Sequence, residues 1–266
     1  MADLWGGEPR LHQGLSRRFY HRYRADLPDS LEVGRVITDP GTARLSAVLF
    51  DFGGTLDADG VAWKERFFRL WCEEAGAVAP ERFAPAFYAA DDAVVGAVPP
   101  TLSFRETVRR ITQGIAREMG AADSALVERV AARFVEEAVE RLRASALVLD
   151  QLSRRYRLGI VSNFYGNLSS VCEEVGLSPL LAVMVDSACV GCVKPDPRIF
   201  QAALTGLNAK PEQAVFIGDS LPRDMAGAKG IGMPHIWLTP ETTPAEKPCC
   251  TGDRVIHALE ELRHVL

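Results

Sequence analysis

The feature that most constrains the fold of this chain is a set of five short apolar runs that begins at residue 45. Each run has the length of a β-strand, is rich in β-branched residues and mostly lacks apolar–polar alternation. Strands of this kind are buried on both faces, as in a parallel sheet covered by helices. The runs lie at residues 45–50, 158–162, 180–185, 214–218 and 235–238.

Helical patterns lie between the later runs, at residues 167–176, 197–207 and 221–232, and a last helix is expected over 253–266. This alternation predicts an α/β fold with a doubly wound, Rossmann-like parallel sheet. Because right-handed crossovers place the carboxyl ends of all the strands at one edge, ligands are expected to bind at that edge.

The interval after the first run is far longer than a crossover needs. It reads as four helices, at approximately 62–76, 80–96, 102–119 and 124–144, the last of them clearly amphipathic. An insert hinged directly after the first strand would act as a lid. We therefore expect three parts: an N-terminal extension at 1–44, an α/β core at 45–60 and 145–266, and an inserted helical cap at 61–144.

Composition narrows the class of protein. The 266 residues are 47% hydrophobic, which suffices for a large buried core, and the net charge of −5 gives no electrostatic footprint for nucleic acid. No apolar stretch reaches the roughly 20 residues that span a bilayer, and no signal-peptide core is present near residue 1. We expect a cytoplasmic protein that binds neither nucleic acid nor membrane, and its oligomeric state stays open.

Two further segments carry weaker signals. Residues 10–24 hold five arginines, two histidines and no acid. Because acids flank this segment, a solvated helix or mobile leader is favoured over a docking arm or targeting peptide.

Two cysteine pairs, Cys189 with Cys192 and Cys249 with Cys250, could bind zinc or act in redox chemistry. Only the first pair has CxxC spacing, so free thiols are favoured.

Polar residues end or follow four of the predicted strands. They occur in "DFGGTL" after the first strand, "VSN" at the second, "VKPDPRIF" after the third and "IGDSLPRD" after the fourth. The residues are Asp51, Ser162, Asn163, Lys194, Asp219 and Asp224. The topology predicts that these side chains meet at one edge of the sheet.

These residue types suit chemistry on phosphorus. A carboxylate such as Asp51 can attack phosphorus, but a phosphate dianion repels it, so cations are needed. Lys194 offers one cation, and Mg²⁺ held by carboxylate oxygens offers a stronger one. Asp51 and Asp219 are the expected oxygen ligands, with Asp224 in support.

The remaining members of the set suit phosphate binding. The Ser162 hydroxyl and backbone N–H groups can hold phosphate oxygens. Gly53 and Gly54 let the backbone approach a ligand closely.

The four motifs resemble those of the haloacid dehalogenase superfamily, over roughly residues 45–240. The resemblance implies a Rossmann-like core, a C1-type helical cap, usually Mg²⁺, and Asp51 as a nucleophile that forms an aspartyl intermediate. In the phosphatases of that family a second aspartate of the first motif is the general acid and base, and its backbone carbonyl binds the metal. Here that position is Gly53, whose carbonyl can still bind Mg²⁺ but which has no proton to transfer.

Three hypotheses follow from Gly53. The chain is a Mg²⁺-dependent phosphatase in which another group, such as Asp57 or Asp59, transfers protons, or whose substrate needs none. Alternatively, it cleaves carbon–halogen or phosphonate bonds, with Lys64 as a candidate Schiff-base lysine. The third hypothesis is a weakly active or non-catalytic phosphate-binding protein.

Substrate contacts are expected from the cap and from the loops that face it. The expected substrate is a small phosphorylated metabolite. The candidate residues are Gly54, Trp63, Asn163 and Tyr165, with Arg66, Arg105 and Asn167 as further possibilities. His235, His257 and His264 lie away from the motifs and are expected to be structural or surface residues.

Overall fold

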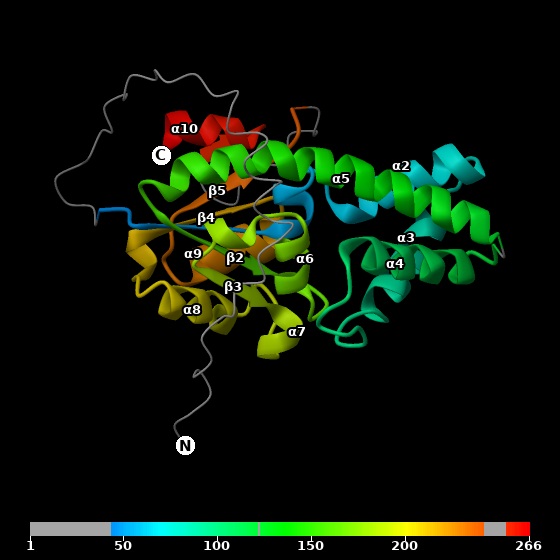
Figure 1. Ribbon diagram of the computed structural model, residues 1–266, viewed down its shortest axis with the longest axis horizontal. Coiled ribbons are helices and arrows are strands. Elements are labelled where there is room, and N and C mark those ends of the chain that lie inside the picture. Colours follow the sequence, from blue (N-terminus) through cyan, green and yellow to red (C-terminus); the bar gives the residue numbers. More distant parts are fainter. Residues whose placement is uncertain (1–43, 122, 242–253) are drawn as a thin grey trace. The chain divides into compact units, whose positions relative to one another are not determined.

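A six-stranded parallel sheet forms the core of this computed structural model, which describes residues 44–121, 123–241 and 254–266 (Figure 1). The sheet order is β3–β2–β1–β4–β5–β6. The strands are β1 Ala47–Phe50, β2 Arg157–Ser162, β3 Val183–Asp186, β4 Ala214–Gly218, β5 His235–Leu238 and β6 Arg254–Ile256. This confirms the predicted α/β fold. The basic segment at 10–24 and the pair Cys249 and Cys250 lie outside the described residues.

The order of the strands reverses at β1, which lies between β2 and β4. Phe50 at the end of β1 is in register with Ile160 of β2 and with Ile217 of β4. The carboxyl ends of these three strands are therefore nearly level. In open α/β sheets the crevice at such a reversal is the place where ligands bind.

The sheet is buried on both faces, which explains why its strands do not alternate between apolar and polar residues. Leu49 packs into a cluster with α8 (Pro197–Gly206) and α9 (Ala226–Gly230). Val48 and Phe50 pack on the opposite face, in a cluster with α5 (Ser124–Ser153) and α6 (Leu168–Glu174). Figure 1 shows α5 on one side of the sheet and α8 with α9 on the other.

The long interval after β1 forms a helical insert made of α2 (Trp63–Ala75), α3 (Pro80–Asp92), α4 (Phe104–Glu118) and the first part of α5. The four predicted helices are present, with ends that differ by a few residues. The fourth does not stop at 144, because α5 continues to Ser153. One unbroken helix therefore belongs both to the insert and to the covering of the sheet, and the boundary predicted at 144/145 falls within it.

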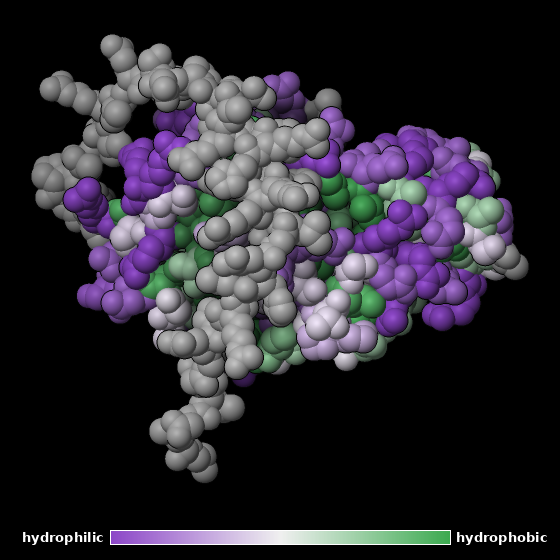
Figure 2. All heavy atoms as spheres, in the orientation of Figure 1, coloured by the Kyte–Doolittle hydropathy of each residue, from purple (hydrophilic) through white to green (hydrophobic). Residues whose placement is uncertain are grey.

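Much of the surface of the insert that faces the viewer in Figure 2 is hydrophilic. Ion pairs join two helices of the insert, α2 and α5, through Arg133 with Glu74 at 2.8 Å and Arg129 with Glu74 at 2.9 Å. None of the helices in the described residues is both long and apolar enough to cross a membrane.

Two predictions for secondary structure need correction. The helix expected over 253–266 is β6, then a 3₁₀ turn at Leu259–Glu261, then the short α10 (Leu262–Val265). Val255 and Ile256 pair with β5 at the edge of the sheet. Helical periodicity alone had assigned these two residues to a helix. The strand expected at 180–185 begins only at Val183, because Ser178–Leu180 forms a 3₁₀ turn, and it is followed by α7 (Ser187–Val190).

Gly159 in β2 generates a prediction about packing. A Cβ atom there would meet Cγ1 of Val183 and would lie 2.8 Å from Cδ2 of Leu49. Gly159→Ala is therefore expected to lower the free energy of unfolding by about 1–3 kcal/mol through overpacking. Chemical denaturation measures it, with Gly230→Ala as the control because no atom lies within 4 Å of a Cβ there. Equal stability of the two variants would contradict the packing.

Candidate active site

The carboxylate of Asp51 is held by three donors where the strand ends meet. Its Oδ1 accepts hydrogen bonds from the Phe52 amide at 2.7 Å and the Ser162 hydroxyl at 2.8 Å, and lies 2.8 Å from Nζ of Lys194. All three contacts fall on one oxygen. Within the described residues, Oδ2 accepts no hydrogen bond, so one oxygen is fixed and the other is free to react.

Lys194 is buried between two carboxylates. Its Nζ lies 2.8 Å from Asp51 and 2.7 Å from Oδ1 of Asp224, and the residue is only 3% exposed. Burial alone lowers the pKa of Lys194, but Asp224 and Asp51 outweigh it, so the pKa is raised above its usual value. The lysine therefore stays charged and supplies one buried positive charge at the strand ends.

Asp51, Asp219 and Asp224 form a group of acids in which one oxygen from each lies within 4.8 Å of the others. Burial, followed by repulsion from Asp224 and Asp51, raises the pKa of Asp219 well above its usual value. Thr55 donates a hydrogen bond to Asp219 at 2.9 Å. Three crowded carboxylates outnumber the two nearby cations, Lys194 and Arg223, and hard oxygen donors in this arrangement fit a divalent cation such as Mg²⁺.

Glycines let the backbone lie against two of these acids. A Cβ on Gly54, whose φ is +88°, would lie 2.6 Å from Oδ2 of Asp219, and one on Gly218 would meet Oδ2 of Asp224. Gly54 was predicted to contact substrate. The structure places it against Asp219, and its amide donates to Asp57 at 2.7 Å.

The space beside Gly53 is filled by Trp63 from the start of α2. A Cβ on Gly53 would lie 3.0 Å from the indole Nε1. That Nε1 donates a hydrogen bond to Oδ2 of Asp57 at 2.7 Å, which fixes the ring. The absence of a side chain at position 53 is therefore matched by a tryptophan that occupies its volume.

Asp57, a candidate for proton transfer, is instead a buried anchor. Its Oδ2 accepts from Trp63 and from Arg66 at 2.8 Å, and its Oδ1 accepts from the Gly54 amide. Burial raises the pKa of Asp57, and Arg66 is the strongest opposing influence. The guanidinium of Arg66 also donates to the backbone carbonyl of Phe134 at 3.0 Å, and it lies 3.8 Å from the centroid of the Phe134 ring. Arg66, a possible substrate contact, is thus an internal partner of Asp57.

Other candidates from the sequence lie away from the reacting groups. Asp59 pairs with Arg141 at 2.9 Å, and burial raises its pKa to about 6. Asn167 is buried and donates to Thr107 at 2.8 Å, and Arg105 is exposed near Glu128.

Within the described residues, the aspartate group is the only set of three or more side chains close enough to hold a metal ion, and it includes neither Cys189 nor Cys192.

A cavity of about 130 Å³ opens between the strand ends and the insert. Asp51, Ser162, Lys194 and Asp219 line it, together with the predicted residues Gly53, Trp63, Asn163 and Tyr165. The amide of Asn163 also orders the loop that carries Lys194, since its Oδ1 accepts from the Lys194 amide at 2.7 Å.

Sequence reasoning missed three polar residues that line this cavity: Tyr88, Asp91 and Arg223. Arg223 stands within the quoted "IGDSLPRD" motif, which was a usable signal. Tyr88 and Asp91 stand in an ordinary amphipathic helix and carried no signal of their own.

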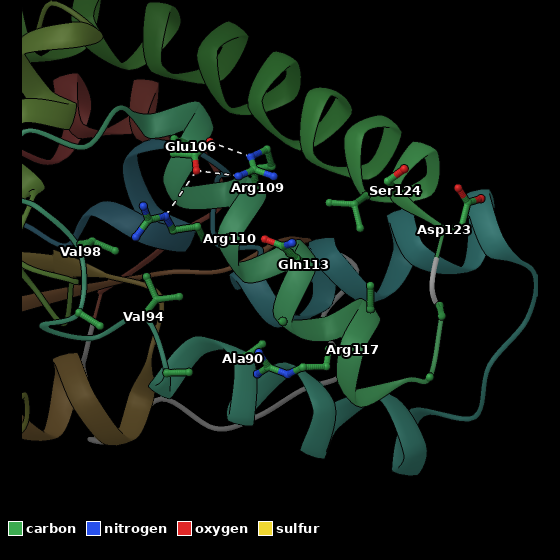
Figure 3. Close-up of a pocket in the computed structure, with 17 residues that line it drawn as sticks. Ala90, Val94, Val98, Glu106, Arg109, Arg110, Gln113, Arg117, Asp123 and Ser124 are labelled. Carbon is green, nitrogen blue, oxygen red and sulfur yellow. Dashed lines mark hydrogen bonds and ion pairs between the residues drawn. The ribbon is translucent and has the colours of Figure 1, made fainter.

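A larger hollow of about 960 Å³ lies within the insert, among α3, α4 and the start of α5 (Figure 3). Its lining combines small apolar residues with Glu106, Arg109 and Arg110, and both arginines form ion pairs with Glu106. None of the residues that line it belongs to the aspartate group. The larger cavity therefore does not coincide with the aspartate group, two members of which, Asp51 and Asp219, line the smaller one.

The chain is similar to known proteins. A family model for haloacid dehalogenase-like hydrolases matches residues 45–232. The haloacid dehalogenase-like hydrolase domain-containing protein 3 of Bos taurus is 36% identical over 113 residues, 42% of this chain and 45% of that protein. Glyceraldehyde 3-phosphate phosphatase of Methanothermobacter thermautotrophicus is 35% identical over 106 residues, 39% of this chain and 46% of that protein. The chain thus spans about half the length of these curated relatives.

Solved structures share the fold. The putative HAD-hydrolase YfnB of Bacillus subtilis, in a structure bound to magnesium, has a TM-score of 0.55 at 24% identity and covers 84% of this chain and 99% of its own. A dehalogenase has a TM-score of 0.58 at 20% identity, covering 84% of this chain and 97% of its own. At these identities the likeness concerns the fold alone, and it includes enzymes of more than one chemistry.

The fit between position 53 and Trp63 can be tested by substitution. Gly53→Asp is expected to lower the free energy of unfolding by about 1–3 kcal/mol, because the new side chain must displace a fixed indole. Gly53→Ala should cost less, since only the Cβ contact at 3.0 Å must relax. Denaturant midpoints measure both. If Gly53→Asp were as stable as the parent protein, the Trp63 side chain would move aside at no cost, which would contradict the predicted fit.

The anchor at Asp57 gives a prediction with a defined pH dependence. Arg66→Met leaves a buried carboxylate unpaired and should cost about 3–5 kcal/mol at neutral pH. The pKa of Asp57 in the folded protein is already raised, and loss of Arg66 raises it further. At pH values above the pKa of an unfolded aspartate, keeping Asp57 ionised in the folded variant therefore lowers the free energy of unfolding. The cost should therefore shrink as the pH falls and Asp57 is protonated.

Arg69→Met on the same helix is the control for this measurement. Its guanidinium makes exposed pairs with Glu73 and Glu137, so its loss should cost less than about 1 kcal/mol. Denaturation between neutral and acidic pH distinguishes the two variants. A cost for Arg66→Met that does not change with pH would contradict the role of Asp57.

Proposed function

The chain belongs to the haloacid dehalogenase-like hydrolase family, and from that premise we propose that it is a cytoplasmic Mg²⁺-dependent phosphatase acting on a small phosphorylated metabolite. The observation that carries the proposal is Asp51: one oxygen is held by three donors and the other is free, beside an aspartate group that fits a divalent cation. The phosphatase relative supports the substrate class.

In the proposed reaction the free oxygen of Asp51 attacks phosphorus, and the bond from phosphorus to the leaving oxygen breaks. The phosphoryl group is then attached to Asp51, and water attacks it to release phosphate and restore the carboxylate. Ser162 and Lys194 already lie within hydrogen-bond distance of Asp51, so they are placed to hold the phosphoryl oxygens as charge develops.

Asp51, Asp219 and Asp224 would hold the metal ion, with the Gly53 carbonyl as a further proposed ligand. The chemistry that Mg²⁺ supplies when bound is neutralisation of the phosphate charge. The acids also orient the site without it, since Asp224 positions Lys194 at 2.7 Å. The cavity of about 130 Å³ favours a small substrate.

The alternative chemistries are less well supported. A Schiff-base lysine needs a lowered pKa, whereas Glu65, 2.8 Å from Lys64, raises the pKa of that lysine. The family resemblance implies that its dehalogenases work without Mg²⁺ and lack the pair of acids represented here by Asp219 and Asp224. The crowded acids therefore favour phosphate chemistry over carbon–halogen cleavage.

Turnover assays test the proposal. An acyl phosphate, p-nitrophenyl phosphate and a sugar phosphate are each assayed with Mg²⁺ and with EDTA. We expect Mg²⁺-dependent release of phosphate that chelation abolishes. Asp51→Asn should abolish it as well, because an amide is a far weaker nucleophile than a carboxylate.

Glu118→Gln serves as the control, because Glu118 is an exposed carboxylate that pairs with Arg117 at 3.2 Å, so its loss should leave turnover unchanged. A phosphoryl group trapped on the parent protein, and absent from Asp51→Asn, identifies the nucleophile. Turnover that persists in EDTA or in Asp51→Asn would refute the proposed mechanism.

A further inference from the structure

Asp91 is the one carboxyl that lines the small cavity without belonging to the aspartate group, among the residues that the structure describes. It lies near the end of α3, so it comes from the insert and not from the sheet. The other lining carboxyls, Asp51 and Asp219, belong to the proposed nucleophile and metal site. Asp91 is therefore the carboxyl free to take another task.

The acids close to Gly53 in sequence cannot take that task. Asp57 is 1% exposed, and both of its oxygens are engaged by Gly54, Trp63 and Arg66. Asp59 pairs with Arg141 and does not line the cavity. Gly53 has no side chain to titrate, and Trp63 occupies the adjacent space.

Asp91 is positioned by the loop that follows β2. The Tyr165 hydroxyl donates a hydrogen bond to its Oδ1 at 2.6 Å, and the Gly96 amide donates to the Tyr165 carbonyl at 3.1 Å. Oδ2 of Asp91 accepts no hydrogen bond within the described residues. As at Asp51, one oxygen is fixed and the other is available.

Several charged or titratable groups surround Asp91. Burial and the neighbouring Asp92 raise its pKa, whereas the Tyr165 hydroxyl and Arg223 lower it, with burial the strongest influence and the result a raised pKa. Tyr88 and Lys64 also line the cavity. A carboxyl in such surroundings can carry a proton closer to neutral pH than an exposed aspartate can.

We propose that Asp91 is the proton-transfer group of this hydrolase, delivered to the phosphoryl site by the insert. In the first step the protonated carboxyl gives its proton to the leaving oxygen as the bond to phosphorus breaks. In the second, the resulting carboxylate takes a proton from the water that attacks the phosphorus of aspartyl-phosphate at Asp51. Free phosphate leaves, Asp51 is restored, and Asp91 is again protonated. The inference rests on the proposed phosphatase function.

Asp91→Asn tests the assignment, with Asp92→Asn as the matched control because Asp92 is the adjacent, exposed carboxyl. With a sugar phosphate, whose alkoxide leaves poorly, Asp91→Asn should lower kcat by about 10²–10⁴-fold. With p-nitrophenyl phosphate, whose phenolate needs no acid, the first step should survive while water attack slows. A burst of nitrophenolate and an accumulated phosphoenzyme should then appear in this variant alone.

Tyr165→Phe separates positioning from proton transfer. Loss of the hydroxyl removes a hydrogen bond that stabilises the Asp91 carboxylate, so the pKa of Asp91 should rise. In the dependence of kcat on pH, the limb that reports the ionisation of Asp91 should therefore move to higher pH, and the variant should still turn over substrate. A purely structural role would lower the rate without moving that limb.

The outcomes distinguish the inference from the function it rests on. If the parent hydrolyses these phosphates and Asp91→Asn matches it on the sugar phosphate, the inference is wrong and the function stands. A uniform loss on every substrate without a burst also overturns it. If the parent forms no phosphoenzyme with any of the substrates, the proposed function fails, and the inference fails with it.

Discussion

The crowding of three carboxylates around one buried lysine is the constraint on which the rest of this structure depends. Parallel strands in register bring Asp51 and Asp219 to the same edge of the sheet, and Lys194 lies between Asp51 and Asp224. Like charges at this spacing oppose folding unless cations offset them. Lys194 and the nearby Arg223 together cannot balance three acids, so the same crowding that costs stability creates an affinity for a divalent cation and for a phosphoryl group bound with it.

A second constraint follows from position 53. Trp63 fills the volume beside Gly53, and its indole is held by Asp57, which in turn binds Arg66. These contacts tie the first helix of the insert to the loop that carries Asp51. The volume that the family's acid would occupy is thus taken by Trp63, and the proton for the leaving oxygen must come from another residue. Asp91 lines the same cavity.

What the sequence predicted and what it missed differ in physical origin. Ser162 and Asp219 were predictable because apolar runs mark buried strands, and parallel strands align their ends. The anchoring of Asp57 depends on how α2 docks, and the position of Asp91 depends on how α3 packs across the cavity. Neither leaves a local pattern in the sequence. The edge strand β6 was missed because three residues paired with β5 are too few to show a strand period.

The division of the reacting groups between sheet and insert has a consequence for how such a site works. Asp51 directly follows β1 and Lys194 lies in the loop before α8, whereas Asp91 belongs to α3. The Tyr165 hydroxyl, from the loop after β2, is linked to Asp91 by a hydrogen bond of 2.6 Å. Any movement that breaks this hydrogen bond separates the proposed acid from the proposed nucleophile. Chemistry on a poor leaving group would then require the insert to be closed, which also excludes bulk water from the phosphoryl intermediate. Because the cavity has a volume of only about 130 Å³, the closed insert would also admit only small substrates.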